Sequence, residues 1–253
     1  FKISLPRTDI AATIMGLPVA PDFALEGMVT FQAHAGQEAM KFMLALLDEE
    51  VNPVLTALLA SNLQPQTEVF AALHNHYLGD EPAIKFIHGL AIGVAEEMAA
   101  ELYAVLSENS GTPFGHGEPP PGDPGFDWEE VAAIIGGMAE LHNGILSIMI
   151  PRSERFVERG VQLEPEMQIS HMFKFQLIEG ARVNLSEFVV WQDEAAPAAR
   201  ALREAGFMVS ALHNHELDIN PLAFHLHASA SGEPLDLAQR IRALLDMAGM
   251  LPM

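Results

Sequence analysis

The feature that most constrains this chain is an internal duplication. The segment Ala72–His76, with the sequence ALHNH, returns unchanged as Ala211–His215. In both copies a further histidine follows at the same spacing, His88 in the first and His227 in the second. A duplicated pattern predicts two similar folding units, because each copy tends to form the same elements. We therefore expect two repeats rather than one irregular domain.

Other segments extend the duplication along the chain. A short alternating stretch ends in Pro-Arg in both halves, a second stretch matches further on, and an acidic, proline-containing segment precedes a helical pattern in both. Acidic residues and an early proline are typical of a helix N-terminus, where they meet the exposed amides and the positive end of the dipole. These matching pairs are Phe1–Arg7 with Leu146–Arg152, Met28–Gln32 with Met172–Gln176, and Asp48–Pro53 with Trp191–Pro197.

Each half then continues with two alternating stretches and a helix. In the first half, Thr67–His76 and Ile84–Ile92 flank a turn at Gly79–Pro82, which is typical of a β-hairpin, and Val94–Leu106 has helical periodicity. The predicted fold is α+β: two ββαββα units, each with a histidine-bearing β-hairpin, related by a pseudo-two-fold and packed through their sheets. A parallel doubly wound sheet is less favoured, since no Gly-rich crossover turn is present.

A segment rich in proline and glycine separates the two copies. We expect a first repeat at 1–106, a linker at 107–125 and a second repeat at 126–253. The second repeat should open with a helix from about Phe126 to Glu140, with Asp127 as its N-cap.

Composition excludes several classes of function. With 34 acidic and 13 basic residues the formal net charge is −21, which disfavours nucleic acid as a partner. The chain has no cysteine, so it forms neither disulfides nor thiolate metal sites. No apolar run approaches the ~18 residues of a membrane helix. The oligomeric state is left open.

The histidines of the first repeat are expected to converge. Residues i and i+2 of a strand share a face, so His74 and His76 should project together. If the hairpin closes symmetrically about Asp80–Pro82, His74 lies opposite His88, with Cβ atoms ~5 Å apart. The same construction applies to the second repeat, where His225 stands in place of Phe86. The candidate metal ligands, one group in each repeat, are His74, His76, His88, His213, His215 and His227.

Converging imidazoles suit transition metals better than Ca²⁺ or Mg²⁺. We expect Zn²⁺ first, with Fe, Cu, Mn or Ni as alternatives. Glu50 or Glu194 could supply a fourth ligand or a general base, which makes these glutamates the candidate catalytic residues. Two alternatives stay open: the histidine pattern is a polar hairpin motif copied without metal, and the two glutamates only stabilise helix starts.

Four segments carry a resemblance to a known family: Leu5–Asp9, Asp48–Val54, Ala72–His76 and Phe86–His88. They resemble the uncharacterised family that includes the mycobacterial lipoproteins LppY and LpqO, over essentially the whole chain. The resemblance implies export and little chemistry. Two departures stand out. Phe42-Met43 replaces the Gly-Asp pair usual in the family, and the motif after Glu194 is shortened to Ala-Ala-Pro.

The sequence therefore predicts an extracytoplasmic metal-binding protein, and one form of this prediction is a metal-dependent enzyme that acts on a small substrate. The alternative is a non-catalytic module that binds a small ligand or sequesters metal. The chain opens on Phe1 rather than methionine, so we expect a leader to precede it in the natural protein. The extra histidine and the shortened motif predict that the sites of the two repeats differ.

Overall fold

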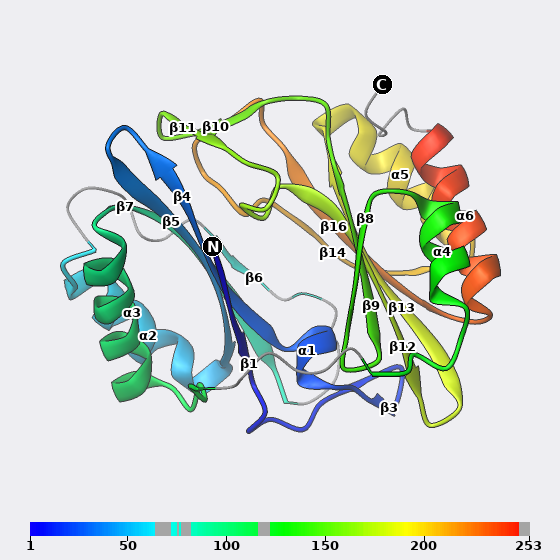
Figure 1. The fold of residues 1–253 in the computed structure, drawn as a ribbon, viewed down its shortest axis with the longest axis horizontal. Coiled ribbons are helices and arrows are strands. Elements are labelled where there is room, and N and C mark those ends of the chain that lie inside the picture. Colours follow the sequence, from blue (N-terminus) through cyan, green and yellow to red (C-terminus); the bar gives the residue numbers. More distant parts are fainter. Residues whose placement is uncertain (64–71, 75, 77–81, 116–121, 248–253) are drawn as a thin grey trace.

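Two β-sheets packed face to face, with helices on their outer sides, form the body of the molecule (Figure 1). This computed structural model describes residues 1–63, 72–74, 76, 82–115 and 122–247. The first sheet has five strands in the order β1-β4-β5-β7-β6. Their bounds are β1 (Lys2–Pro6), β4 (Glu26–His34), β5 (Gln37–Leu47), β6 (Ala72–His74) and β7 (Ile84–Gly93).

The second sheet repeats this order and adds one strand. Its six strands run β14-β16-β13-β12-β9-β8, so β9, β12, β13, β16 and β14 take the places of β1, β4, β5, β7 and β6. A mixed α+β fold with a duplicated sheet is confirmed. The bounds are β8 (Met138–His142), β9 (Ile145–Pro151), β12 (Ser170–Ile178), β13 (Ala181–Val190), β14 (Met208–His213) and β16 (Phe224–Ser231).

The five strand positions that the two sheets share exceed the predicted ββαββα unit by one. In the first repeat β1, β4 and β5 come before the helix at Asp48–Ala60, and in the second β9, β12 and β13 come before the helix at Gln192–Glu204. The second and third of these form a tight hairpin, β4 with β5 and β12 with β13. The turns are Ala35-Gly36 and Glu179-Gly180, and all four residues have positive φ. Two consecutive residues with positive φ are what a type I′ hairpin turn requires. The turn geometry is thus duplicated together with the strands.

Helices cover the outer face of each sheet. On the first sheet lie α2 (Asp48–Ala60) and α3 (Ala95–Asn109), and on the second α4 (Trp128–Ile135), α5 (Gln192–Glu204) and α6 (Pro234–Met247). Buried apolar residues of α2 and α3 pack on even-numbered residues of β5 such as Phe42, and those of α4 to α6 pack on Phe173 and Phe188. This burial of an apolar helix stripe supplies most of the stability of such layers.

The helix expected from 126 to 140 is shorter than predicted. It ends at Ile135, because Gly136 and Gly137 both have positive φ and break the helical path. Residues 138–142 instead form the edge strand β8. The predicted division at 107 and 125 stays a prediction.

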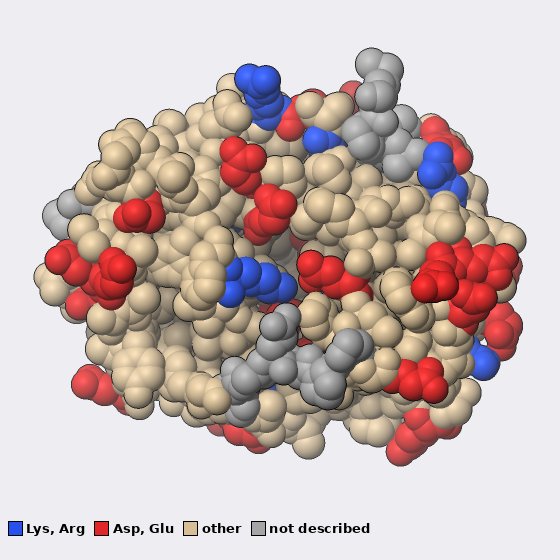
Figure 2. All heavy atoms as spheres, in the orientation of Figure 1, with Lys and Arg blue, Asp and Glu red and all other residues tan. Residues whose placement is uncertain are grey.

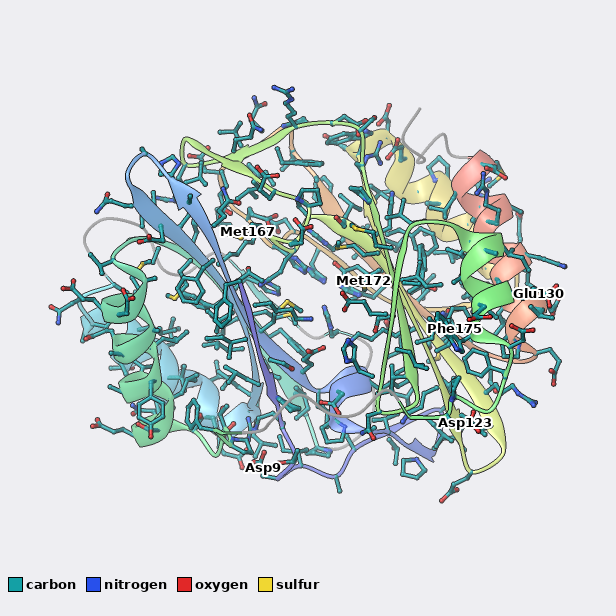
Figure 3. The ribbon with its side chains drawn as sticks, in the orientation of Figure 1. Asp9, Asp123, Glu130, Met167, Met172 and Phe175 are labelled. Carbon is teal, nitrogen blue, oxygen red and sulfur yellow. The ribbon has the colours of Figure 1, made fainter. Side chains whose placement is uncertain are left out.

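The space between the sheets is filled by side chains from both repeats (Figure 3). One cluster joins Ala45 and Phe86 of the first sheet to Val183 and Leu185 of the second. Another joins Leu90 to Val189 and to Met167. The two repeats therefore share an interior core, as two sheets packed face to face do.

Small elements close the ends of this interior. Between β1 and β4 the chain forms β2 (Thr13–Ile14), β3 (Leu17–Pro18) and the short helix α1 (Pro21–Ala24), whose apolar residues join the core between the sheets. In the second repeat, β10 (Phe156–Glu158), β11 (Val161–Leu163) and β15 (Ile219–Asn220) make a three-stranded sheet.

The surface shown in Figure 2 carries many more acidic than basic side chains, as the net charge of −21 requires. No helix in the described part of the chain is both long and apolar enough to cross a membrane.

Candidate metal centre

The two-residue period of the strands points a set of polar residues into the space between the sheets. On β16 the even-numbered Leu226 and Ala228 face the helices, so His225 and His227 face the interior. The same alternation on β7, β13 and β5 turns His88, Glu187 and Lys41 inward. Because the apolar side chains of these strands pack against the helices on the outer face, the histidines lie on the inner face.

Four imidazoles meet in this interior. They belong to His76, His213, His215 and His227, and one nitrogen of each lies within 4.8 Å of the others. His76 comes from the first repeat and the other three from the second. The ring centroids of His76 and His227 are 3.9 Å apart, and those of His213 and His227 are 4.8 Å apart. His76, His215 and His227 are buried, and His213 is half-buried.

Among the residues whose side chains the structure describes, this arrangement differs from the expected separate site in each repeat. Both repeats contribute to a single cluster, because their sheets face each other and their histidines occupy equivalent inward positions. Strand periodicity shows which face of a strand is buried, but it does not show which other face is packed against it.

The predicted strand register is also wrong. His74 lies opposite Phe86, and Ala72 lies opposite His88. In the second repeat, His213 correspondingly pairs with His225 and Ala211 with His227. The shift is by two residues, so the inward face of each strand is preserved even though the partners differ. The side chain of His74 lies outside the described residues.

A second group of possible ligands adjoins the first. It consists of Glu187, His215 and His225, again with ligand atoms within 4.8 Å of one another. Glu187 Oε1 and His225 Nδ1 are 2.6 Å apart, and the rings of His215 and His225 stack with centroids 3.4 Å apart. His215 belongs to both groups, which makes them neighbours.

Buried charges surround this second group. The Lys41 ammonium donates to Glu158 Oε2 at 3.3 Å and to Glu216 Oε1. Burial alone would lower the pKa of Lys41, but the two carboxylates raise it above its ordinary value. Burial alone would raise the pKa of Glu216, but Lys41 and His225 bring it to about 2. Burial raises the pKa of Glu158 against the attraction of Lys41.

His225 is held as a cation in this environment without metal. Burial alone would lower its pKa, yet the hydrogen bond with Glu187 and the nearby Glu216 raise the pKa to about 9. Any metal that binds His225 must therefore displace a proton.

Glu50 and Glu194, the candidate catalytic residues, lie at the starts of α2 and α5. Arg7 binds Glu50 through two nitrogens, at 2.7 and 3.0 Å, and Arg152 binds Glu194 at 2.8 and 3.2 Å. The amide of Leu47 also donates to Glu50, and that of Trp191 to Glu194. Among the described residues, neither glutamate belongs to a group that could hold a metal. Their geometry is that of the helix-start alternative.

Each arginine of these pairs also binds a second carboxylate and a backbone carbonyl. Arg7 binds Asp9 and Ala45 O, and Arg152 binds Glu154 and Val189 O. Burial alone would lower the pKa of Arg7, but Asp9 and Glu50 raise it. The repeated Pro-Arg motif is thus explained as a structural brace, the arginine brace, which links the end of β1 to β5 and α2 in the first repeat and the end of β9 to β13 and α5 in the second.

His88, the remaining predicted ligand, lies beside the cluster. Its ring stacks on His215 with centroids 3.8 Å apart, and its Nδ1 is 3.3 Å from Gln168 Oε1. It is absent from both metal-competent groups of the described residues. A stacked, hydrogen-bonded imidazole can hold His215 in place without being a ligand itself.

Sequence reasoning missed Glu187, Glu216 and Lys41. A signal was present for Lys41, which interrupts the apolar run from Ala39 to Leu47, where charges are rare unless paired. Glu187 gave a weaker signal, because its strand also contains Arg182, Asn184 and Ser186. Glu216 follows the histidine motif directly and gave no such signal.

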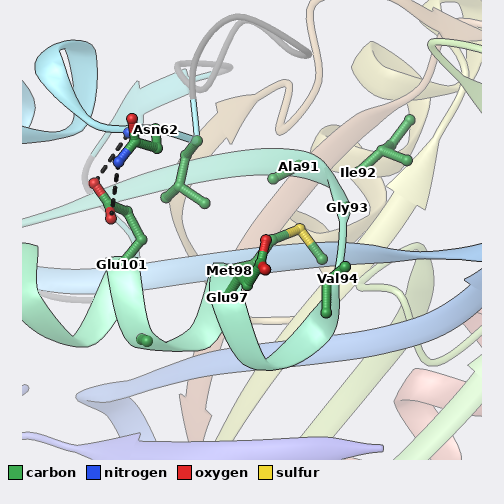
Figure 4. Close-up of a pocket in the computed structure, with 10 residues that line it drawn as sticks. Asn62, Ala91, Ile92, Gly93, Val94, Glu97, Met98 and Glu101 are labelled. Carbon is green, nitrogen blue, oxygen red and sulfur yellow. Dashed lines mark hydrogen bonds between the residues drawn. The ribbon is translucent and has the colours of Figure 1, made fainter.

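A surface hollow of about 500 Å³ lies elsewhere, between α3 and the end of β7 (Figure 4). It is lined by Ile92, Met98, Glu97 and others, and Glu101 there accepts hydrogen bonds from Asn62. None of the described residues that line it is a histidine, and none belongs to the histidine cluster.

Comparison with known families gives one match. The family described as Domain of Unknown Function (DUF1259) matches residues 1–108 and 129–247. The chain belongs to this family. The match covers both repeats and omits the segment between them, which agrees with a duplication. Comparison with curated proteins and with solved structures gives no significant match.

Proposed function

We propose that this protein binds a transition metal ion between its two repeats, with His76, His213, His215 and His227 as ligands. The observation that carries the proposal is the convergence of four imidazoles from both repeats within 4.8 Å, three of them buried. Histidine is rarely buried in groups, because each ring must find a partner for its nitrogens. A metal ion satisfies four rings at once.

The donor set favours Zn²⁺, with Fe, Cu, Mn or Ni as alternatives. Four nitrogens match the tetrahedral coordination of Zn²⁺, whose Zn–N distance of about 2.0–2.1 Å sets ligand nitrogens about 3.4 Å apart. Nitrogens within 4.8 Å of one another reach this geometry by small side-chain movements. The nearby carboxylates of Glu187 and Glu216 offset the charge of the ion.

The four nitrogen ligands favour, as the first candidate, a holding role, in which the protein binds the metal ion for structure or for sequestration and not for catalysis. A closed tetrahedron leaves no position for substrate, which is the pattern of structural or sequestering sites rather than of catalytic ones. Metal-dependent catalysis on a small substrate is the second candidate. It is favoured by Glu187, whose Oε2 lies 4.0 Å from His227 Nδ1 and could take a proton from a metal-bound water.

Elemental analysis of protein purified without a histidine tag tests the proposal. We expect at least one equivalent of transition metal after reconstitution with Zn²⁺, and a higher melting temperature with Zn²⁺ than without. Replacing His142, a partly exposed histidine of β8, with glutamine should change neither result. Less than about 0.2 equivalents of any transition metal would overturn the proposal.

Water exchange separates the two roles. In the holding role the bound ion has no exchangeable water, whereas a catalytic ion keeps one. Pulsed electron–nuclear double resonance on Cu²⁺- or Co²⁺-substituted protein in deuterated water detects such a metal-bound water directly.

We further propose that the protein acts outside the cytoplasm, as a relative of the LppY and LpqO lipoproteins. The support is the sequence resemblance alone. Fractionating cells that express the full-length natural protein tests this, and recovery in the cytoplasmic fraction would contradict it.

A further inference from the structure

The cluster holds more metal-competent side chains than one ion can use. We propose that Glu187, His215 and His225 bind a second cation, so that the protein holds a two-metal centre. This inference rests on the proposed function, since the second position adjoins the first. It deepens that function by identifying the ion that would be open to a small ligand.

The geometry of the second group supports a cation. Its carboxylate and two imidazoles lie within 4.8 Å of one another, on the adjacent central strands β13 and β16 and on the segment after β14. Glu187 and His227 are paired across β13 and β16, which fixes the position of the carboxylate in the ladder. His215 and His225 are buried, so few alternative conformations are open to their rings.

Two residues connect the second position to the first. His215 belongs to both groups, and an imidazole has two nitrogens, so one ring can bind two ions once its N–H proton is released to solvent. Glu187 reaches the same two groups with its two oxygens, Oε1 to His225 at 2.6 Å and Oε2 to His227 at 4.0 Å. Shared ligands of this kind are what brings two metal ions within a few ångströms.

The fixed charges also favour an additional cation. The carboxylates of Glu158, Glu187 and Glu216 face two cationic groups, the Lys41 ammonium and the His225 ring, so negative charge remains in excess in the interior. Excess charge of one sign is expensive to bury unless it is compensated. A divalent ion at Glu187, His215 and His225 offsets it where the carboxylates converge.

Three ligands leave the second ion an open coordination position, unlike the four-histidine position. An open position on a divalent ion binds water or a small anion. The ligand class that fits this centre is therefore a small oxyanion or carboxylate that can reach the second ion.

The first repeat provides matched substitutions for a test. Met43 and Phe86 occupy the positions that Glu187 and His225 occupy in the second repeat. The variants Glu187→Met and His225→Phe therefore place in the second repeat side chains that the same scaffold already accommodates in the first. His171→Gln is the control, because His171 is a buried histidine outside both groups whose Nδ1 accepts a hydrogen bond from Val189 N.

Zinc stoichiometry decides the question. With Zn²⁺ alone we expect two equivalents in the natural chain and in His171→Gln, and one equivalent in His225→Phe and in Glu187→Met. Glu187→Gln, which keeps the size of the side chain, should weaken the second ion at least tenfold even if the other variants fold poorly. One equivalent in the natural chain, unchanged by these variants, would overturn the inference while leaving the four-histidine site intact. No bound zinc at all would instead overturn the proposed function.

Cobalt substitution gives an independent result. Two Co²⁺ ions with a shared ligand couple magnetically, so we expect a weak electron paramagnetic resonance signal at two equivalents. In His225→Phe the single ion should show the full uncoupled signal. An uncoupled signal that rises linearly to two equivalents in the natural chain would show that the two ions are not neighbours and would also overturn the inference.

Discussion

The two repeats have the same strands in the same order, yet their inward faces carry different chemistry. Opposite His88 the first repeat has Met43, whereas opposite the equivalent His227 the second repeat has Glu187. Two residues before His88 the first repeat has Phe86, and two residues before His227 the second repeat has His225. The scaffold was duplicated, and the polar groups were not kept equally in both copies.

This difference separates what holds the fold from what forms the site. The arginine brace is present in both repeats, with Arg7 and Glu50 matched by Arg152 and Glu194. A feature that both copies retain at the same place serves the shared scaffold. Glu187 and His225, which only the second copy has, serve the one cluster that both copies share.

The largest effect that tests this comparison is the loss of metal binding. The second repeat supplies three of the four histidines, so His213→Ala with His215→Ala should lower Zn²⁺ affinity by more than about 100-fold. His76→Ala removes one ligand and should cost about 10- to 100-fold. Competition with a chromophoric chelator measures both. Equal losses from the two repeats would indicate two equivalent sites instead of a shared one.

Substitutions in the arginine brace should lower the stability of the fold and leave the affinity for metal unchanged. Glu50→Gln leaves Asp9 as the one carboxylate that binds the buried Arg7 and should lower the free energy of unfolding by about 2–3 kcal/mol. Glu194→Gln should cost less, about 1–2 kcal/mol, because Glu194 is more exposed than Glu50. Urea unfolding measures both, with the exposed Glu49→Gln as control. A tenfold loss of Zn²⁺ affinity in Glu50→Gln would contradict a purely structural role and would show that Glu50 acts as a ligand or catalytic residue.

A salt bridge between the repeats predicts a pH dependence. Glu26 of β4 binds Lys174 of β12 at 2.7 Å. Burial alone would raise the pKa of Glu26, but Lys174 and Lys2 lower it from 4.5 to about 2. A lowered carboxyl pKa stabilises the fold above pH 4.5, and this contribution, about 2–3 kcal/mol, is lost as the pH falls from 4.5 to 2.

Unfolding experiments between pH 2 and pH 7 measure this dependence. Lys174→Met should flatten the part of the profile that belongs to Glu26. If the variant and the natural chain lose stability in parallel over this range, the two repeats are not coupled through this pair.

The smallest effect concerns an exposed contact between the repeats. Gln32 of the first repeat donates to Gln162 O at 2.7 Å and accepts from Glu164 N at 3.0 Å. Gln32→Ala should lower the free energy of unfolding by about 0.5–1 kcal/mol, since exposed hydrogen bonds contribute little net energy. Gln37→Ala, at an exposed position of β5, serves as control. A loss above about 2 kcal/mol would mean that this contact orients the two sheets.

The sequence by itself determined the duplication, the α+β class and most of the strands. It did so because these depend on local patterns: alternation along Ile84–Gly93, acidic residues in the first turns of the helices that begin at Asp48 and Gln192, and glycines at turns. It also identified His76, His213, His215 and His227 as metal-competent, because the repeated spacing of the histidines can be read directly from the sequence.

Only the tertiary structure decided how those histidines are grouped. One strand face carries no information about the face that packs on it, so the shared cluster and the charged partners Lys41, Glu187 and Glu216 follow from the contact between the sheets. The register of β6 on β7 likewise depends on the whole sheet, because a shift by two residues keeps the same face inward. Likewise, only the tertiary structure shows that Glu50 pairs with Arg7, because the two residues are far apart in the chain and meet at the start of α2.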